Sequence, residues 1–514
     1  MELNWIDWTG FIIFSVAVTA YAMWKSRKEQ SAKDYFLGGR SMGWMLVGFS
    51  LISSNISSEH FVGMSGAAFG GAGLAIASYE FIAAVTLVFV AFFLLPLYLR
   101  TGIYTIPEFL EYRYGSAPRT LMAFYMMIAY CCIVMVAVLY AGAIALQAMF
   151  GLDLVWGVWI VGLCAGLYTA FGGLKAVAYS DLLHGGALIV GGCVVTYLGL
   201  SRVGPLGEFF AANREKFHMV LPADHPTIPW TALLMGIWIP NIYYWGFNQF
   251  ITQRALAAKT LAEGQLGILF AALQKIFIPA IIVLPGIIAY QLFRDKIPNG
   301  DLAYPTLIRE IVPLGIRGML LAALSGAIMS ALAAVLNSAS TIFTLDFYKR
   351  FINKNSTDKQ DVFMGRASTI VATIIACALA PYAGKLSGIF QFMQTAWGCF
   401  SPGITAAILF GLVFRKAPTA AAMSALIGGV IVYGGGLIGM HYKVFPEIAS
   451  LNLMAITFII LVAIMGVITA VAPLKVAVEF KKQDAAMDLR SSPLAKLLAV
   501  LVVILVAGVY IILR

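Results

Sequence analysis

Long apolar runs follow one another along almost the whole chain. They recur at about 20 residues, which is the length of α-helix that crosses the hydrocarbon core of a bilayer. No segment has the regular polar and apolar alternation of membrane-barrel strands. The pattern predicts an all-α, polytopic membrane protein with about 14 spans, at roughly 5–24, 42–70, 75–98, 120–149, 153–171, 179–201, 230–250, 265–292, 315–347, 366–384, 387–413, 418–440, 447–472 and 494–513.

Two of these spans are interrupted by polar residues. The stretch from Ser53 to Tyr79, which ends against Glu80, carries six serines, an asparagine, a glutamate, a histidine and five glycines. The seventh span is also interrupted midway, and we predict its break at Pro240-Asn241. Irregular backbone at membrane depth is tolerated where it lines a cavity, and a pair of broken helices in two halves of a transporter points to its binding site. The sequence therefore predicts a transporter site at these breaks.

Composition agrees with this assignment. Of 514 residues, 61% are hydrophobic and 11% charged, whereas soluble proteins carry about 25% charged residues. The net charge is +10, and 23 of the 34 lysines and arginines fall in alternate connections, with 10 on the other side. This is the positive-inside pattern, so both termini are expected to face outward. The basic charge is a topology signal and implies no nucleic-acid partner.

The remaining features argue for one transporter domain and against an enzyme. The first apolar segment, Trp5 to Met23, precedes KSRKEQ rather than a cleavage site, so we interpret it as a retained helix. The longest connections, 202–229 and 473–493, are too short for a soluble core, and Tyr104 to Gly115 predicts a short interfacial helix. The six cysteines lie in apolar runs without a metal or disulfide pattern. No phosphate-binding glycine loop or catalytic constellation is present, which excludes an ATP-driven pump.

Polar groups at membrane depth need a role, because each costs a few kcal/mol (about 3 for a charge on the mildest scale). Around the two breaks, carboxylates that accept and amides and amines that donate would suit a small polyhydroxylated ligand. Tyr244 and Trp245 can close over its apolar face. The alternative is that these groups only bond helix to helix. The ionisable residues at membrane depth are Glu59, His60, Glu80, Asp181, His184 and Lys275. The neutral polar residues at membrane depth are Asn55, Asn241, Tyr244, Asn248, Gln249, Gln274, Gln394 and Ser330.

A cation such as Na⁺ needs hard oxygen ligands. Leu51 to Ile56 can supply carbonyls at the break, and the ninth span carries Ser325, Ser330 and Ser338 among small residues that can equally serve close helix packing. Asp181, at the start of the sixth span, is either a helix cap or part of a cation path. Asp346 and Arg366 are predicted to be ordinary interface charges.

Six motifs carry a family resemblance: SSNISSEHFVGMSG, GLAIASYE, LPLYLRTGIYTIPEFLEYRYG, FGGLKAVAYSD, NIYYWGFNQFITQRALAAK and LNSASTIFTLDFYK. They resemble, in order over nearly the whole chain, the sodium:solute symporter family, and within it the sodium/glucose and sodium/galactose cotransporter branch. The resemblance implies LeuT-type architecture in the plasma (inner) membrane: an extra helix at 5–24, inverted repeats at 42–201 and 230–413, and three further helices at 418–514.

The resemblance also implies site residues. The sugar site would use Asn55, His60, Glu80, Asn241, Lys275 and Gln394, with Tyr244 as inner gate and Met64, Tyr79 and Phe390 packing around it. The sodium site would use carbonyls of Ser53, Ile56 and Ala327 and the hydroxyl of Ser330, with Asp181 as a waypoint for the ion. Three positions depart from the pattern. His60 is Gln in the bacterial galactose transporter and His in animal glucose transporters, Ala331 replaces a second serine, and His184 stands where relatives usually have Gln.

The function implied is Na⁺-driven import of a neutral hexose such as galactose or glucose by alternating access, with sodium ion, sugar and lipid bilayer as partners. Within the family, Na⁺- or H⁺-coupled import of myo-inositol, a uronate or another solute stays open. A proton-translocating subunit of a respiratory complex is the alternative from another class, although proton relays do not need broken helices with amides. The pattern selects no particular sugar, stoichiometry or oligomeric state.

Overall fold

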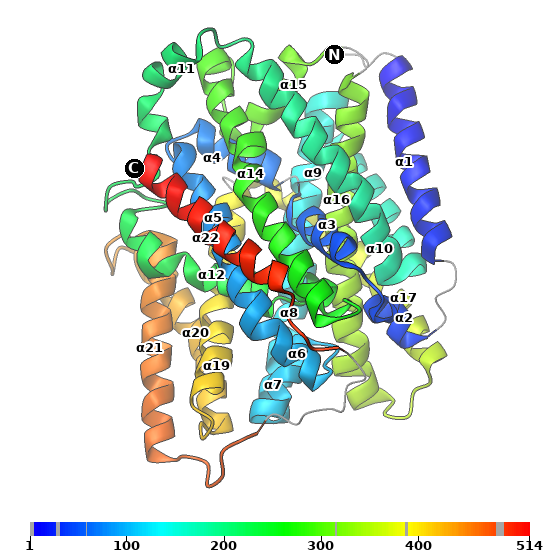
Figure 1. The fold of residues 1–514 in the computed structure, drawn as a ribbon, viewed down its shortest axis with the longest axis vertical. Helices are drawn as coiled ribbons and strands as arrows, with labels where there is room; N and C mark the ends of the chain where they lie inside the picture. The colour runs from blue at the N-terminus through cyan, green and yellow to red at the C-terminus, as the bar shows by residue number, and fades with distance from the viewer. Residues whose placement is uncertain are drawn as a thin grey trace.

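The computed structural model describes residues 5–26, 31–57, 59–313, 316–385, 389–479 and 488–513. The predicted inner connection 473–493 therefore lies partly outside the described residues. Within the described ranges the regular structure is helical, and the β contacts are two isolated bridges, Met42 with Ala258 and Leu221 with Pro229. The all-α prediction is confirmed, and Figure 1 shows the helices gathered in one bundle.

In the described part of the chain, nine helices are long and apolar enough to cross a membrane. A tenth is added if the pair Phe390–Gly398 and Ser401–Val413, which meet at 47°, counts as one span. The number is lower than the predicted count because broken spans divide into short helices and two predicted spans join into one. The nine are Gly73–Thr101, Ser116–Ile144, Leu154–Leu200, Leu261–Phe293, Ile316–Ile352, Asp358–Ala383, Thr419–His441, Ser450–Val471 and Pro493–Ile512.

The joined spans form α10 (Leu154–Leu200), which contains a sharp bend at Gly173. Gly173 has φ 60° and ψ −171°, a conformation that residues with a Cβ rarely adopt. The bend separates the predicted spans 153–171 and 179–201. The N-terminus of α10 is capped by Asp153, whose Oδ1 accepts a hydrogen bond from Val155 N at 2.9 Å.

The first broken helix lies where the polar stretch predicts it. α3 (Trp44–Asn55) is followed by Ile56, whose backbone is extended, with φ −78° and ψ 107°. The chain resumes as the π-helical turn η2 (Glu59–Met64) and continues as α4 (Ser65–Phe69).

The second broken helix has its break elsewhere than predicted. Asn248 is extended, with φ −88° and ψ 122°, whereas Pro240 and Asn241 lie inside α12 (Trp238–Ile242). The prediction from Pro240 is wrong because Pro240 lies in the first turn of α12, where a backbone N–H needs no partner within the helix and a proline is tolerated. The Asn241 amide group adds a bond to Ile237 O at 2.9 Å. The elements around the break are η7 (Ala232–Gly236), η8 (Tyr243–Phe247) and α13 (Gln249–Leu256).

The other helices surround these two breaks. In Figure 1, α1 begins and α22 ends in the upper half of the view, and α6 and α7 lie at the lower end. The predicted helix in 104–115 is present as α7. The remaining principal elements are α1 (Trp5–Ser26), α2 (Ala32–Leu37), η3 (Gly73–Ala77), α5 (Ser78–Phe89), α6 (Leu95–Thr101), α7 (Ile106–Tyr114), α8 (Ser116–Ile128), α9 (Met135–Phe150), α11 (Leu206–Ala212), α14 (Leu261–Phe293), η9 (Gly300–Leu302), α15 (Ala303–Ile311), α16 (Ile316–Ile342), η10 (Phe343–Ile352), α17 (Asp358–Leu379), α18 (Ile389–Gly398), α19 (Ser401–Val413), α20 (Thr419–His441), α21 (Ser450–Val471) and α22 (Pro493–Ile512).

Candidate functional site

A cavity of about 60 Å³ lies between the two broken helices, α5, α14 and α18. The structure brings together around it all ten residues that the resemblance places at the sugar and its gate. Their roles stay predictions, but their proximity is a property of the fold. They are Asn55, His60, Glu80, Asn241, Lys275, Gln394, Tyr244, Met64, Tyr79 and Phe390.

A buried ion pair forms one wall of this cavity. Lys275 Nζ lies 2.5 Å from Glu80 Oε2 and also donates to Asn55 Oδ1. The ammonium group lies 5.1 Å from the centre of the Trp245 ring. Because both ions are buried, each needs the other, and removing one partner would leave an uncompensated charge. The pair is thus a fixed set of donors and acceptors facing the cavity.

Two further contacts connect this pair to the broken helices. The Asn55 amide nitrogen donates to the Tyr244 hydroxyl at 3.0 Å, which joins the end of α3 to η8. His60 lies between two carboxylates, with Nε2 3.6 Å from Glu80 Oε1 and Nδ1 3.6 Å from Glu59 Oε1. Glu59 was recognised in the sequence as a polar residue at membrane depth but was not assigned to the sugar site, and it lines the cavity.

Aromatic rings bound the cavity on two sides. The Phe390 ring packs edge-on against Tyr79, with centroids 5.2 Å apart, and lies 6.5 Å from the His60 ring. Tyr244 packs edge-on against Phe250 at 5.4 Å and faces Trp397 at 6.5 Å. A solute in the cavity would therefore be enclosed between apolar ring faces and the polar groups of α3, α5 and α14.

The predicted ion ligands gather on the other side of α3. Ser53 Oγ lies 3.0 Å from Ser330 Oγ, which joins the last turn of α3 to α16. The amide of Ser57 faces His60 Nδ1 at 3.5 Å rather than the carbonyl of Ser53. The end of the helix thus releases carbonyl oxygens beside two hydroxyl groups, and such hard oxygens suit Na⁺. Ile56 and Ala327, the other predicted ligands, are buried on the same two helices.

Asp181 lies directly at this cluster. Ser330 Oγ donates to its Oδ1, while Ser50 and Ser54 donate to its Oδ2 at 2.6 and 3.2 Å. The possibility that Asp181 caps a helix is wrong, because Asp181 lies well inside α10, is fully buried and bonds to other helices. A carboxylate in contact with Ser330 remains compatible with a place on the ion path.

Arg254 completes the cluster and was missed in the sequence. The predicted spans 230–250 and 265–292 leave Arg254 in the connection between them, but it is fully buried in α13. Its Nη2 lies 3.4 Å from Asp181 Oδ2, and its Nε donates to Ser50 Oγ at 2.9 Å. Residues 248–254, which read NQFITQR, gave a usable signal, because a helix restarting after a break at Asn248 would carry this arginine into the bundle.

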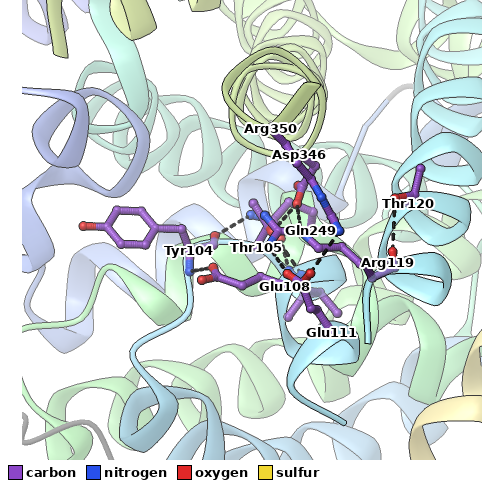
Figure 2. Close-up of polar contacts among 11 residues, drawn as sticks. Tyr104, Thr105, Glu108, Glu111, Arg119, Thr120, Gln249, Asp346 and Arg350 are labelled. Carbon is purple, nitrogen blue, oxygen red and sulfur yellow. Dashed lines mark hydrogen bonds and ion pairs between the residues drawn. The ribbon is translucent and has the colours of Figure 1, made fainter. Parts of the chain in front are cut away.

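A second group of charges lies near α7 (Figure 2). Asp346, predicted to be an ordinary interface charge, is fully buried: Arg119 Nε donates to its Oδ1 at 2.6 Å, and Thr105 Oγ1 does so at 3.3 Å. The prediction is wrong because η10 packs against α7 and α8 instead of facing solvent. Glu111 adds ion pairs with Arg119 at 2.5 Å and with Arg350 at 3.0 Å.

Gln249 connects this charge group to the second helix break. Its Oε1 accepts from Ile106 N at 2.9 Å, and its Nε2 donates to Tyr104 O at 3.0 Å (Figure 2). Since Gln249 is the first residue of α13, the network ties the α7 segment to the part of the bundle that also holds Arg254. Ion pairs and hydrogen bonds therefore link α7, α8, η10 and α13 at this end of the molecule.

The family model of the sodium:solute symporter family matches residues 35–429 of the sequence. The chain belongs to the sodium:solute symporter family. It is a sodium-coupled solute symporter, and the sodium ion is the ion it uses.

Curated relatives agree with this assignment. The sodium/glucose cotransporter of Vibrio parahaemolyticus is 40% identical over 459 residues, covering 83% of this chain and 84% of that protein. The sodium/myo-inositol cotransporter 2 of Sus scrofa is 32% identical over 462 residues, covering 82% of this chain and 68% of that protein.

Among solved structures, the substrate-bound, outward-open state of a Na⁺-coupled sialic acid symporter matches with a TM-score of 0.80. The match covers 92% of this chain and 99% of that one at 23% identity, so it speaks for the fold alone. The fold is of the LeuT type, as the resemblance implied.

Proposed function

We propose that this symporter imports a neutral hexose, such as galactose or glucose, together with Na⁺. The observation that carries the proposal is the Lys275–Glu80–Asn55 cluster on a cavity formed at two helix breaks. The 40% identity to a sodium/glucose cotransporter supports the same substrate class. The proposal assigns the sugar to the cavity and the ion to the opposite side of α3.

In this proposal, sugar hydroxyls exchange for the bonds now made within the cavity. Glu80 accepts from hydroxyl groups, while Lys275 and the amides of Asn55, Asn241 and Gln394 donate to sugar oxygens. The ring faces of Tyr244 and Phe390 cover the apolar sides of the sugar. Exchange of buried bonds for sugar bonds makes the site selective, because a ligand lacking a hydroxyl would leave a buried group without a partner.

The ion would bind between the last turn of α3 and α16. Carbonyls of Ser53, Ile56 and Ala327 and the hydroxyl of Ser330 would surround it, and the carboxylate of Asp181 would lie behind Ser330. Bound Na⁺ would hold α3 against α16 and thereby orient Asn55 for the sugar. Inward movement of one charge through about 100 mV contributes about 2.3 kcal/mol, before any concentration difference.

The orientation and internal symmetry are part of the same proposal. We assign the side of the 202–229 connection and α15 as outer and the side of α7 and η10 as inner, with both termini outward in the plasma membrane. The segments 42–201 and 230–413 would be inverted repeats, each beginning with a broken helix. The positive-inside distribution of lysine and arginine supports this orientation.

Another polyol is the competing substrate within the family. A relative is named a sodium/myo-inositol cotransporter, and His60 with Lys275 also leaves room for an acidic sugar. Competition of myo-inositol, glucuronate, glucose and galactose for uptake of one labelled hexose would distinguish these solutes.

The direct test is uptake of labelled galactose and glucose into proteoliposomes with and without an inward Na⁺ gradient. We expect concentrative uptake with the gradient only. Uptake that does not depend on Na⁺ and stops when a proton gradient is collapsed would refute the ion assignment. Na⁺-driven uptake of another solute, with no uptake of either hexose, would refute the sugar assignment alone.

A further inference from the structure

Glu59 is a carboxylate of the central cavity that the proposed sugar contacts do not use. It is the first residue of η2 (Glu59–Met64), shortly after the first helix break, and it lines the cavity of about 60 Å³. Its side chain is only 12% exposed. A carboxylate removed from water to this extent needs a cation or hydrogen-bond donors in place of water. The groups around Glu59 therefore decide which ligand the cavity favours.

The charges of the cavity wall do not balance. Among the described residues that line the cavity, the carboxylates are Glu59 and Glu80, and Lys275 is the one lysine or arginine. Lys275 Nζ lies 2.5 Å from Glu80 Oε2 and also donates to Asn55 Oδ1. Lys275 is thus the partner of Glu80, and one negative charge remains at Glu59.

His60 does not neutralise this charge, although its ring lies beside Glu59. His60 Nδ1 faces the amide of Ser57 at 3.5 Å, a group that can only donate, so Nδ1 is an acceptor. The ring proton is then on Nε2, which faces Glu80 Oε1 at 3.6 Å. Glu59 Oε1 lies 3.6 Å from Nδ1, which is longer than a hydrogen bond, so the two atoms share no proton.

The second carboxylate oxygen, Glu59 Oε2, is a buried acceptor to which no group of the described residues donates. A sugar hydroxyl can donate to this oxygen but leaves the negative charge uncompensated. An ammonium group donates and also neutralises the charge, and such charge-assisted hydrogen bonds are roughly twice as strong as neutral ones. The cavity therefore favours a ligand that carries one positive charge.

We propose that the central site prefers an amino hexose to the neutral sugar, with Glu59 as the counter-ion of the ligand's ammonium group. The inference rests on the proposed function for the position of the sugar, and it deepens that function by naming the substrate class. Lys275, Glu80 and the side-chain amides hold the hydroxyl groups as before, and the ammonium group donates to Glu59. A uronate is disfavoured, because its carboxylate would add to the negative charge of the cavity wall.

The test compares the Kd of galactosamine with the Kd of galactose on purified protein, in saturating Na⁺ at about pH 7, where an amine of this kind is mostly protonated. For the wild type we expect galactosamine to bind about 10-fold more tightly, the difference between a charged and a neutral hydrogen bond. Glu59→Gln keeps the size and one side-chain oxygen but removes the charge, so the two Kd values should come within about 2-fold of each other. Glu59→Asp keeps the charge and should retain the preference for galactosamine.

Glu208→Gln is the matched control, because it makes the same substitution on α11, where Glu208 is exposed and lies outside the cavity. It should keep the wild-type ratio of the two Kd values, and thermal unfolding checks that all variants fold. The wild-type ratio tests the proposal without any substitution. Equal Kd values in the wild type, or a preference that persists in Glu59→Gln, would overturn the proposal.

Na⁺-driven uptake of the same two sugars separates this inference from the proposed function. Uptake of galactose without preferential binding of galactosamine would overturn the inference alone. Preferential binding of galactosamine without Na⁺-driven uptake of either sugar would overturn the proposed function alone. Na⁺-driven uptake of galactosamine, with no uptake of galactose or glucose, would overturn the neutral hexose as substrate and support Glu59 as the residue that sets the preference.

Discussion

Two buried ion pairs lie on opposite sides of α3, and they differ in what surrounds them. Lys275 and Glu80 are 2.5 Å apart beside the 60 Å³ cavity. Arg254 and Asp181 are 3.4 Å apart, and the Asp181 carboxylate receives hydrogen bonds from Ser50, Ser54 and Ser330. Neither Arg254 nor Asp181 is among the described residues that line this cavity. The first pair has space for a ligand; the second is packed with hydroxyl groups.

The difference between the two ion pairs indicates how α3 can contribute to the binding of two ligands. Asn55 contacts the first pair, and Ser50 and Ser54, less than two turns earlier on α3, contact the second. A hydroxyl group has one proton and two lone pairs. Ser330 can therefore donate to Asp181 and still offer a lone pair to a cation, with Ser53 as its neighbour at 3.0 Å. Each ligand would change the position of the same helix end, which is a physical basis for coupling.

Removing the cation of the first pair should have the largest effect. Lys275→Met leaves Glu80 buried without a partner, which should cost about 3–5 kcal/mol of folding free energy, and uptake should be lost. Lys275→Met with Glu80→Gln removes both charges, so thermal stability should largely return while uptake stays absent. Full uptake by the single variant would show that the pair does not face the sugar.

Breaking the second pair should affect the ion rather than the sugar. Asp181→Asn removes the negative charge behind Ser330, and we expect the half-saturating Na⁺ concentration for uptake to rise about 10-fold or more, because bonds to charged groups contribute about 1.5–3 kcal/mol. Galactose binding at saturating Na⁺ should change little. A large loss of galactose binding at saturating Na⁺, with unchanged Na⁺ dependence, would contradict the division between the two sides of α3.

A smaller gain is expected from Ala331→Ser. This change adds a hydroxyl beside Ser330, where the resemblance implies a second serine, and should lower the half-saturating Na⁺ concentration about 2- to 10-fold. Ser330→Ala should raise the half-saturating Na⁺ concentration. If both variants have wild-type Na⁺ dependence, the ion does not bind at this end of α16.

The smallest change is expected from His60→Gln. Glutamine keeps a donor and an acceptor near Glu80, so hexose uptake should persist, and the ratio of galactose to glucose uptake at limiting concentration should shift about 2- to 5-fold, the scale of one hydrogen bond. An unchanged ratio would show that His60 does not set the sugar preference.

The same comparison explains what the sequence could predict. Apolar runs gave the helices, and polar residues within apolar surroundings gave the first break and seven of the ten residues around the cavity. The family resemblance added the other three, Met64, Tyr79 and Phe390. Lys275 and Glu80 were accessible to this reasoning because charges in the middle of an apolar run are conspicuous.

The sequence could not place the charges at the ends of runs. Arg254 and Asp346 follow apolar segments and have the pattern of loop charges, yet both are buried by segments distant in the sequence: Ser50 and Asp181 surround Arg254, and Arg119 and Thr105 surround Asp346. The break at Asn248 was missed because Pro240 is the stronger local signal, although this proline lies in the first turn of α12 and does not break it. These outcomes depend on tertiary contacts, which local patterns do not contain.

The central claim is that Na⁺ and sugar bind to opposite sides of one helix end and so affect each other's affinity. The most direct test is to measure the Kd of galactose with and without Na⁺, and the Kd of Na⁺ with and without galactose, on purified protein. Linkage requires the two ratios to be equal, and we predict a ratio of about 5- to 150-fold. The ratio should fall in Asp181→Asn. A galactose Kd that is the same with and without Na⁺ would contradict the account.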